Sequence, residues 1–561
     1  MATSLTVAPS RKPTPKIAIV VQNQRKSSRL AALLVVATFI SCVFQLWWFW
    51  SKCVHQIDID GIDYVGIALK LRQGLFFSSV NGFRSPLISW IIALIPLDVF
   101  RAGKLVSVAT YLVCVGLTYI LALRLWQSKA VAGTAALLFS LSRGVAFGAV
   151  AMITPDLLLT AIVLVYFLVL LEFVRHDRHS LLLGVIHAIA FLAKAFALPW
   201  LTVMSLTAVL LSAGSFKRRS QRFLLAILFP LLAVAFWSLI LHSKYGVFTT
   251  GTQFKTNLLQ WTLKAYREPQ ASRYTVLRDI TRGTDEYMVG DPMPPGSWAW
   301  SYRLKLRQVA PAVLKAESKN LPAMVKEFAI LSNPGLLLGF SILVVRFIRR
   351  RQKLERFAPT IAIIILVGAL ALVFAYSMLV FDSRYLLPLL PLVIAFGTRF
   401  LVPDPSLKSS FFRPLCWGLV SGGVIFFAAY RSSPFRVQTR DFQTICYRAG
   451  AILAHEPVKT VVSIGSGPFP EHGVGWEAGY KAAYFAGKKL IATDEIAPSE
   501  KELPAVMSDL AKAAPDAVFV WQSDDDKRRR LLSTLERHYS EKARILDPVL
   551  GDVGVLLIRA K

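Results

Sequence analysis

The sequence predicts a polytopic α-helical membrane protein with a soluble α/β domain at its C-terminal end, and three observations support this fold class. Of its 561 residues, 55% are hydrophobic, whereas soluble domains contain about 45–50% apolar residues. Most of the excess lies in runs long enough to cross a bilayer, which takes about 20 residues each. After residue 436 the long runs stop, and short apolar segments alternate with amphipathic ones.

The basic residues indicate a membrane topology and predict no nucleic-acid partner. The formal net charge is +30, but much of the Lys and Arg lies in short turns between apolar runs. The positive-inside rule produces this distribution, because the cytoplasmic turns of multi-pass proteins are rich in Lys and Arg. The five cysteines mostly lie within or beside apolar runs, so they predict no disulfide framework.

The chain begins with residues 1–29, which are polar and basic and are predicted to form a disordered cytoplasmic segment. The apolar run Leu30–Trp50 follows. It is too long for a signal-peptide core and lacks a small-residue cleavage site, so we expect a retained span. The run ends in a Trp-rich aromatic belt, which places the residues after it on the exoplasmic side.

Basic turns divide the rest of the membrane part, residues 30–430, into pairs of spans. Five groups of Lys and Arg between Arg124 and Arg413 mark the turns that we expect on the cytoplasmic side. The apolar runs predict about eleven spans in total, and an odd number returns the C-terminal domain to the exoplasmic side. The runs after the first are 105–123, 130–149, 155–174, 181–197, 198–214, 223–242, 327–347, 359–381, 384–402 and 413–430.

Two long connections, residues 51–104 and 243–326, fall on the exoplasmic side in this topology. The first contains the apolar segment Leu87–Leu97, which is short and bounded by proline, as expected of an interfacial segment that does not span. The second is polar and rich in Trp and Tyr. A connection of this length is usually functional or disordered, and its aromatic residues favour an ordered loop.

Residues 436–561 are predicted to form an exoplasmic α/β domain. Helices are expected at Glu502–Ala513 and Lys527–His538. A turn at Gly465–Gly467 resembles the start of a dinucleotide-binding loop but lacks the third glycine, so a tight turn at the strand exit is the preferred interpretation. The predicted strands are Val461–Ile464, Lys489–Ala492, Ala517–Trp521, Arg544–Leu546 and Val553–Ile558.

An acidic cluster, formed by Asp58, Asp60 and Asp63, follows directly after the first span. Carboxylates beside hydrocarbon are costly and tend to be functional. A carboxylate can take a proton from a hydroxyl group as a general base, and nearby Arg or Lys can bind a phosphate without requiring a metal ion. Each Asp could instead cap a helix or be a solvated loop charge.

The first exoplasmic loop resembles that of the GT-C glycosyltransferases. Residues Asp60–Tyr64 read Asp-Gly-Ile-Asp-Tyr, and Arg84–Trp90 read Arg-Ser-Pro-Leu-Ile-Ser-Trp. The similarity is greatest to the branch that contains dolichyl-phosphate-mannose protein mannosyltransferases and lipid A aminoarabinose transferases. It implies that Asp60 is the catalytic carboxylate, four residues before Tyr64. Gly61 stands where this branch usually has Glu.

Three later motifs extend the resemblance over about residues 30–400. Thr154-Pro-Asp156 precedes a span, as the second Asp of the family does. The glycine-containing span Gly184–Lys194 ends in Lys, and Arg384–Pro391 resembles the family's Arg-Tyr-x-x-Pro-x-x-Pro motif. In the predicted topology Asp156, Lys194 and Arg384 all lie at exoplasmic ends of spans, where ionisable residues tend to pair or bind ligand. Lys194 and Arg384 could instead extend to lipid headgroups.

The resulting hypothesis is a GT-C fold with an exoplasmic active site in the plasma or inner membrane. Asp60 is the expected base, and the phosphate of a polyprenyl-phosphate-linked sugar donor is expected at Arg84, Lys194 and Arg384. Asp156 and Tyr385 would orient sugar or phosphate, and the expected substrate site also includes Asp58, Asp63 and Tyr64. The acceptor would be a hydroxyl group of a lipid, a glycan or a protein. No metal ligands and no definite cofactor are predicted, and a divalent cation is left open.

Two other classes of protein remain alternatives. A secondary transporter for an anionic solute would use the same cations, but transporters place them near the midplane of the membrane on broken helices. A non-catalytic cell-envelope assembly protein would not depend on Asp60 for its activity.

Overall fold

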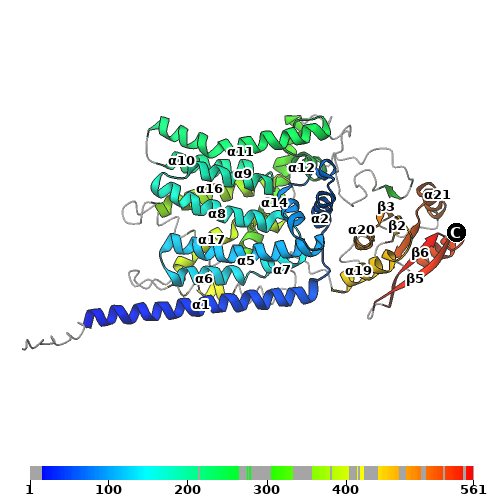
Figure 1. The fold of residues 1–561 in the computed structure, drawn as a ribbon, viewed down its shortest axis with the longest axis horizontal. Coiled ribbons are helices and arrows are strands. Elements are labelled where there is room, and N and C mark those ends of the chain that lie inside the picture. The colour runs from blue at the N-terminus through cyan, green and yellow to red at the C-terminus, as the bar shows by residue number, and fades with distance from the viewer. Residues whose placement is uncertain are drawn as a thin grey trace, which may run out of the picture.

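The computed structural model has two parts, a bundle of helices and an α/β domain at one end of it (Figure 1). The helices of the bundle lie side by side along the long axis of the molecule. The structure describes residues 15–212, 215–263, 275, 277–279, 305–332, 341, 357–379, 382–402, 414, 417–422, 440–465, 475–494, 501–521, 525–547 and 551–559.

The bundle confirms a multi-pass membrane protein. Within the described residues, five helices contain a stretch long and apolar enough to cross a membrane, and the pair α6 (Lys129–Ser140) and α7 (Arg143–Ala151), bent by 55°, forms a sixth candidate. Shorter apolar helices are α9 (Ser180–Ala193) and α10 (Ala197–Leu211). The five long helices are α1 (Pro15–Cys53), α5 (Val99–Trp126), α8 (Pro155–His176), α11 (Phe216–Tyr245) and α16 (Phe357–Ser377).

The run at 384–402 forms a broken helical segment. It consists of η2 (Ser383–Leu386), α17 (Leu390–Gly397) and η3 (Thr398–Phe400). Two prolines in its first half remove backbone donors and interrupt regular helix. The predicted runs 327–347 and 413–430 lie largely outside the described residues, so the total of about eleven spans stays a prediction.

Two expectations from the sequence are wrong in part. Helix α1 begins at Pro15, so residues 15–29 are helical where we expected disorder. The connection 243–326 contains the short helix α12 (Gln253–Asn257), a π-helical turn η1 (Leu258–Thr262) and the start of helix α14 (Leu306–Ser332). Because α14 mixes apolar and charged residues, it lacks the long apolar run by which the spans were recognised.

The first long connection forms three short helices at the end of the bundle next to the α/β domain. They are α2 (Ile59–Arg72), α3 (Phe76–Ser79) and α4 (Leu87–Leu94). At 8 residues, α4 is far shorter than the about 20 residues that a span requires, as its sequence predicted.

The basic turns and the acidic cluster lie at opposite ends of the bundle. The guanidinium group of Arg175 donates a 2.7 Å hydrogen bond to the carbonyl oxygen of Arg124, and Asp177 pairs with Arg222. Helices α5 and α8 therefore end beside the start of α11. At the other end, α2 begins beside residue Ile153, which precedes α8. Consecutive spans thus alternate in direction.

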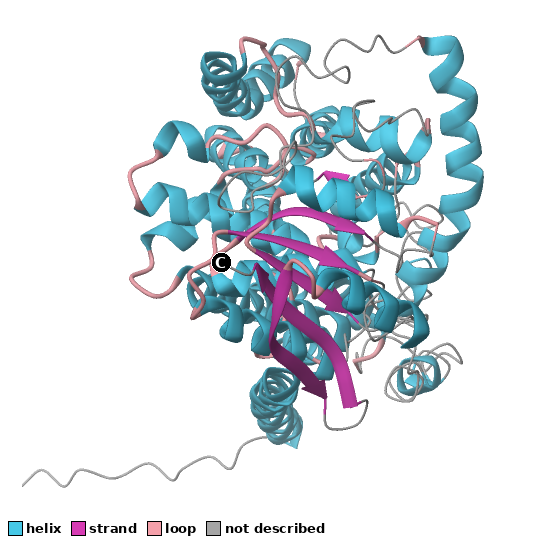
Figure 2. Cartoon of the chain, turned by 90° about the vertical axis from the view of Figure 1, so that its right-hand side faces the viewer, coloured by secondary structure: helices cyan, strands magenta, loops and turns pink. Residues whose placement is uncertain are grey.

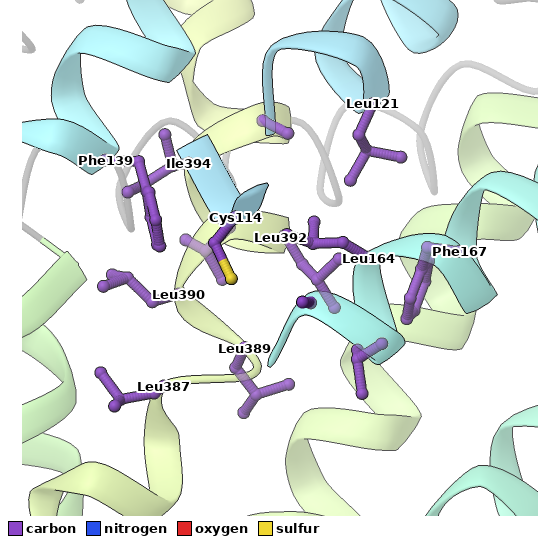
Figure 3. Close-up of a cluster of buried hydrophobic side chains, with 14 of the residues drawn as sticks. Cys114, Leu121, Phe139, Leu164, Phe167, Leu387, Leu389, Leu390, Leu392 and Ile394 are labelled. Carbon is purple, nitrogen blue, oxygen red and sulfur yellow. The ribbon is translucent and has the colours of Figure 1, made fainter. Parts of the chain in front are cut away.

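A large apolar core holds the bundle together. Side chains from α5, α6 and α8 lie around the segment from Leu387 to Ile394 and belong with it to one apolar cluster (Figure 3). Leu121, Phe139 and Leu164 are fully buried there. This packing fixes the broken segment in the middle of the bundle and so sets the position of Arg384, which lies at its start.

The C-terminal domain contains all five predicted strands. They are β2 (Thr460–Ile464), β3 (Lys489–Asp494), β4 (Ala517–Trp521), β5 (Tyr539–Asp547) and β6 (Gly551–Arg559). With β1 (Arg278–Asp279) they form a sheet in the order β1-β3-β2-β4-β6-β5, whose strands lie in front when the molecule is viewed from this end (Figure 2). Strand β2 is parallel to β3 and β4, and the other neighbours are antiparallel. The helices are α19 (Arg440–Ala454), α20 (Gly475–Ala486), α21 (Leu503–Ala513) and α22 (Asp525–Leu535).

The α/β domain and the bundle share one core. Buried residues of α2 and α5 pack in the same cluster as Phe442, Ile445 and Ala482 of α19 and α20. The rings of His55 and Tyr447 stack with centroids 3.9 Å apart. The long connection also joins the domain, because the buried carboxylate of Asp509 accepts hydrogen bonds from the backbone N–H groups of Thr275 and Leu277. The C-terminal domain is therefore packed against the end of the bundle that carries the acidic cluster.

Candidate active site

Helix α2 presents two carboxylates on one face. Asp58 is its N-cap, and Asp60 and Asp63 lie three residues apart, a spacing that puts side chains on the same side of a helix. Asp63 is buried, whereas Asp60 retains 28% of its side-chain exposure. Asp60 is therefore the more accessible of the two.

Arg84 joins these two carboxylates. Its Nε and Nη2 atoms lie 2.7 Å and 2.6 Å from Oδ2 of Asp63, and Nη2 lies 2.7 Å from Oδ1 of Asp60. The side chain of Asn81 accepts hydrogen bonds from the backbone N–H groups of Phe83 and Arg84, which fixes the turn that carries the arginine. The ring of Tyr64 lies 5.7 Å from the guanidinium carbon of Arg84, within cation–π range.

Arg384 approaches Asp60 from the other side. Its Nη2 donates a 2.7 Å hydrogen bond to Oδ2 of Asp60, and its Nε lies 2.8 Å from Asp382. Longer contacts reach Asp58 at 3.7 Å and Asp156 at 3.9 Å. Both oxygens of Asp60 are thus paired with an arginine.

Lys194 completes the network. It is the C-cap of α9, and its Nζ lies 2.5 Å from Oδ1 of Asp156 in the first turn of α8. The ammonium group also lies 4.4 Å from the centroid of the Tyr385 ring. That ring stacks on Tyr376 with centroids 4.3 Å apart. The structure thus brings together all nine residues that the sequence analysis proposed.

The charges in this network stabilise one another. Burial opposes ionisation of Asp60, but Arg84 and Arg384 outweigh it and hold the pKa of this carboxyl well below its ordinary value. Burial likewise opposes the charge on Arg84, and the neighbouring carboxylates Asp60 and Asp63 raise its pKa above the ordinary value. In this state Asp60 is ionised at neutral pH but is a weak base, because its proton affinity is low.

A cavity of about 350 Å³ lies beside the network. Arg84, Lys194 and Tyr385 are among the polar residues that line it, and Phe191 and Trp237 are among the apolar ones. A cavity lined by both cationic and apolar side chains suits a phosphate that is attached to a hydrocarbon chain.

Three residues of this region were missed in the sequence. Lys255 of α12 lines the cavity, and nothing in its polar surroundings distinguishes it. Asp382 lies two residues before Arg384 of the Arg-Tyr motif and could have been included. Lys104 is buried and donates hydrogen bonds to the carbonyl oxygens of Cys53, Gln56 and Val150. A single lysine at the start of an apolar run was a signal for it.

The described part of the chain holds no group of three or more His, Cys, Asp or Glu side chains placed to bind a metal ion.

Comparison with known proteins shows the fold. No protein-family model matches the chain, and no curated protein sequence matches it. Among solved structures, ArnT from Cupriavidus metallidurans in the apo state is similar at 14% identity and a TM-score of 0.51, over 95% of this chain and 98% of that one. The same protein bound to undecaprenyl phosphate is similar at 12% identity and a TM-score of 0.50, over 94% of this chain and 97% of that one.

A second similar structure is the oligosaccharyltransferase of Archaeoglobus fulgidus in complex with Zn and sulfate. It shares 12% identity at a TM-score of 0.50, over 94% of this chain and 72% of that one. These similarities extend over the bundle and the C-terminal domain together. The chain therefore has the GT-C fold, as the sequence resemblance implied.

Proposed function

We propose that the protein is an integral membrane glycosyltransferase that moves a sugar from a polyprenyl-phosphate donor to an acceptor hydroxyl group on the exoplasmic side. The observation that carries the proposal is the contact between the ion network and the cavity. Arg84 and Lys194 belong to both, so a ligand in the cavity would meet cations that hold the catalytic carboxylates. ArnT, which has the same fold, has been solved with undecaprenyl phosphate.

In the proposed reaction the donor phosphate binds at Arg84, Arg384 and Lys194, and the hydrocarbon chain contacts the apolar residues of the cavity, such as Phe191 and Trp237. The oxygen of the acceptor forms a bond to the anomeric carbon, and the bond from that carbon to the phosphate oxygen breaks. The phosphate leaves with the electron pair, and its developing charge is stabilised by the arginines. The acceptor proton passes to Asp60.

Donor binding also prepares the base. Asp60 has a low proton affinity because both of its oxygens contact an arginine. A phosphate competes for the same guanidinium groups, which weakens these pairs and raises the proton affinity of Asp60 when the acceptor is present.

The position of the charges favours a transferase over the alternative of an anion transporter. Asp60, Arg84 and Arg384 lie at one end of the bundle next to the C-terminal domain, whereas transporters bind substrate near the midplane. The remaining alternative, a non-catalytic assembly protein, is distinguished by its independence of Asp60.

The test is transfer of a radiolabelled sugar from polyprenyl-phosphate donors by the purified full-length protein in liposomes. We expect one donor to lose its label to an acceptor, and we expect Asp60→Asn to lower the rate about 10²–10⁴-fold while donor binding remains. Asp98→Asn serves as a control, because Asp98 is an exposed cap of α5 outside the network. Equal transfer by the wild type and Asp60→Asn would refute the proposed mechanism, and no transfer from any donor would refute the enzyme class.

A further inference from the structure

Asp58 is held in place by contacts that differ from those of a helix cap. Its side chain makes no capping hydrogen bond within α2. Its Oδ1 atom instead accepts a 3.1 Å hydrogen bond from the backbone N–H of Ile153, just before α8. A Cβ atom at Gly61 would lie 2.7 Å from this Oδ1, so a glycine one turn later makes room for the carboxylate. The chain has thus built a defined site for Asp58.

The other oxygen of Asp58 has no hydrogen-bond partner. Oδ2 is inaccessible to solvent, and among the described residues no group donates to it. Its nearest cation is Nη1 of Arg384, at 3.7 Å. Asp60, Asp63, Asp156 and Asp382 each have a cation within 2.8 Å. Asp58 is therefore the least neutralised carboxylate of the network.

Among the described residues, the charged groups around Asp58 come from five elements. Asp60 of α2 is a like charge, and Arg384 of η2 is a shared counter-ion that also contacts Asp156 of α8. Lys104 of α5 also acts on Asp58, but its ammonium group donates to backbone carbonyl oxygens. Lys481 of α20 lies beyond Lys104 and pairs with Glu477. A buried carboxylate with so little compensation is more easily protonated than its neighbours.

We propose that Asp58 takes up a proton when the anionic donor binds, so that donor binding and protonation of this carboxylate are coupled. The inference rests on the proposed function, because it assumes a phosphate at Arg84 and Arg384. That phosphate competes for the guanidinium group of Arg384. Asp58 then loses its counter-ion, because among the described residues its one ion pair is this 3.7 Å contact, whereas Asp156 also pairs with Lys194. Burial and Asp60 already raise the pKa of Asp58 above its ordinary value against the opposing effect of Arg384.

Protonation of Asp58 has a consequence for the reaction. Two carboxylates that share a small site do not both stay ionised without sufficient counter-charge. A proton on Asp58 leaves the negative charge of the pair on Asp60. Asp58 is then a positioning residue, because its protonation keeps the negative charge on Asp60. Asp60 remains the group that contacts the acceptor.

The experiment measures proton uptake on binding. The purified full-length protein is titrated calorimetrically with a polyprenyl methyl phosphate, in two buffers of different ionisation enthalpy between pH 6 and pH 9. This phosphodiester has no proton to exchange in that range. We expect the wild type and the exposed control Asp98→Asn to take up protons, and their dissociation constant to rise with pH by up to about tenfold per pH unit. In Asp58→Asn we expect no uptake and a dissociation constant that does not depend on pH.

An infrared difference spectrum of the wild type provides a second readout that does not depend on a variant. Donor binding should produce the C=O band of a protonated carboxyl group. Binding without this band and without proton uptake, or uptake that persists in Asp58→Asn, would overturn the inference alone. Absence of any binding by the wild type would overturn the proposed donor site and the inference together.

Discussion

Arg84 neutralises Asp63 and is also a proposed ligand of the donor phosphate, so one substitution at this residue changes both stability and binding. The side chains of Arg84 and Asp63 are only 7% and 4% exposed. Removal of one partner of a buried ion pair leaves an uncompensated charge and costs about 3–5 kcal/mol. A loss of activity in Arg84→Ala could therefore reflect unfolding and not a missing phosphate contact.

A double variant separates the two effects. We expect Arg84→Ala to lower the melting temperature, and Asp63→Asn in the same chain to restore most of it, because the amide carries no charge. Donor affinity should stay about 10- to 100-fold weaker in both variants, since a hydrogen bond to a charged group contributes about 1.5–3 kcal/mol. Arg84→Lys should recover binding only in part, because Lys lacks the planar fork of Arg. Normal donor affinity in the stable double variant would remove Arg84 from the phosphate site.

At the scale of single elements, helix α2 depends on a small residue at Gly61. Alanine in a helix is usually more favourable than glycine by about 1 kcal/mol. At Gly61, however, a Cβ atom would lie 2.7 Å from Asp58, 3.0 Å from Ile57 and 3.3 Å from Ile153. The side chain of Glu, which is usual here in the glycosyltransferase branch that the sequence resembles, would not fit beside Asp58 in this arrangement.

We expect Gly61→Ala to lower both the melting temperature and the rate of transfer, because the carboxylate of Asp58 must move. Gly116→Ala is a matched control in helix α5, where an added Cβ would meet nothing within 4 Å. Its stability should be unchanged or slightly higher. Equal melting temperatures and rates for the two variants would contradict this prediction, because they would show that the carboxylate of Asp58 can move without loss of stability or activity.

The elements differ in how far the sequence could predict them. Runs such as Leu30–Trp50 and strands such as Ala517–Trp521 are apolar throughout, and hydropathy alone located them. Helix α14 was missed because charged residues interrupt its apolar ones, and Pro311 and Pro322 lie inside it. Asp60 and Arg384 were singled out separately, since both are ionisable residues next to spans. Their pairing across 324 residues depends on the packing of the bundle, as does the approach of Lys255 to the cavity.

At the scale of the whole molecule, the stability that the contact between the bundle and the C-terminal domain contributes should depend on pH. The ring of His55 stacks on Tyr447 of α19, and burial, followed by the charge of Lys104, lowers the pKa of His55. The folded state therefore binds protons less readily than the unfolded state. The stability that the packed, neutral ring of His55 contributes is therefore present above the ordinary histidine pKa of about 6.5, and it is lost as the pH falls below that value toward the lower pKa of the folded state.

We expect the melting temperature of the wild type to decrease between pH 8 and pH 5.5, and to decrease less in His55→Phe, which keeps the stacked ring without a titrating group. Thermal unfolding of both proteins in the same detergent measures the difference. Parallel curves over this range would show that His55 does not contribute to the pH dependence.

The orientation in the membrane follows from the two ends of the bundle. The turns that contain Arg124, Arg175 and Arg178 lie at one end, where α11 also begins with a basic segment. The acidic network and the C-terminal domain lie at the other end (Figure 1). Because Lys and Arg are concentrated in cytoplasmic turns, we expect the network to face the exoplasmic side, where a lipid-linked sugar would reach it.

Cysteine labelling of intact cells tests this orientation. The four cysteines in the described part of the chain are buried, so an introduced cysteine can be compared with the unmodified protein. We expect a membrane-impermeant maleimide to label Glu541→Cys on the exposed strand β5, and to label Arg178→Cys only after the cells are permeabilised. Both positions are exposed in the folded protein, so differences in folding do not explain a contrast between them. The reverse pattern would place the network on the cytoplasmic side, where nucleotide sugars are available, and would remove the argument for a lipid-linked donor.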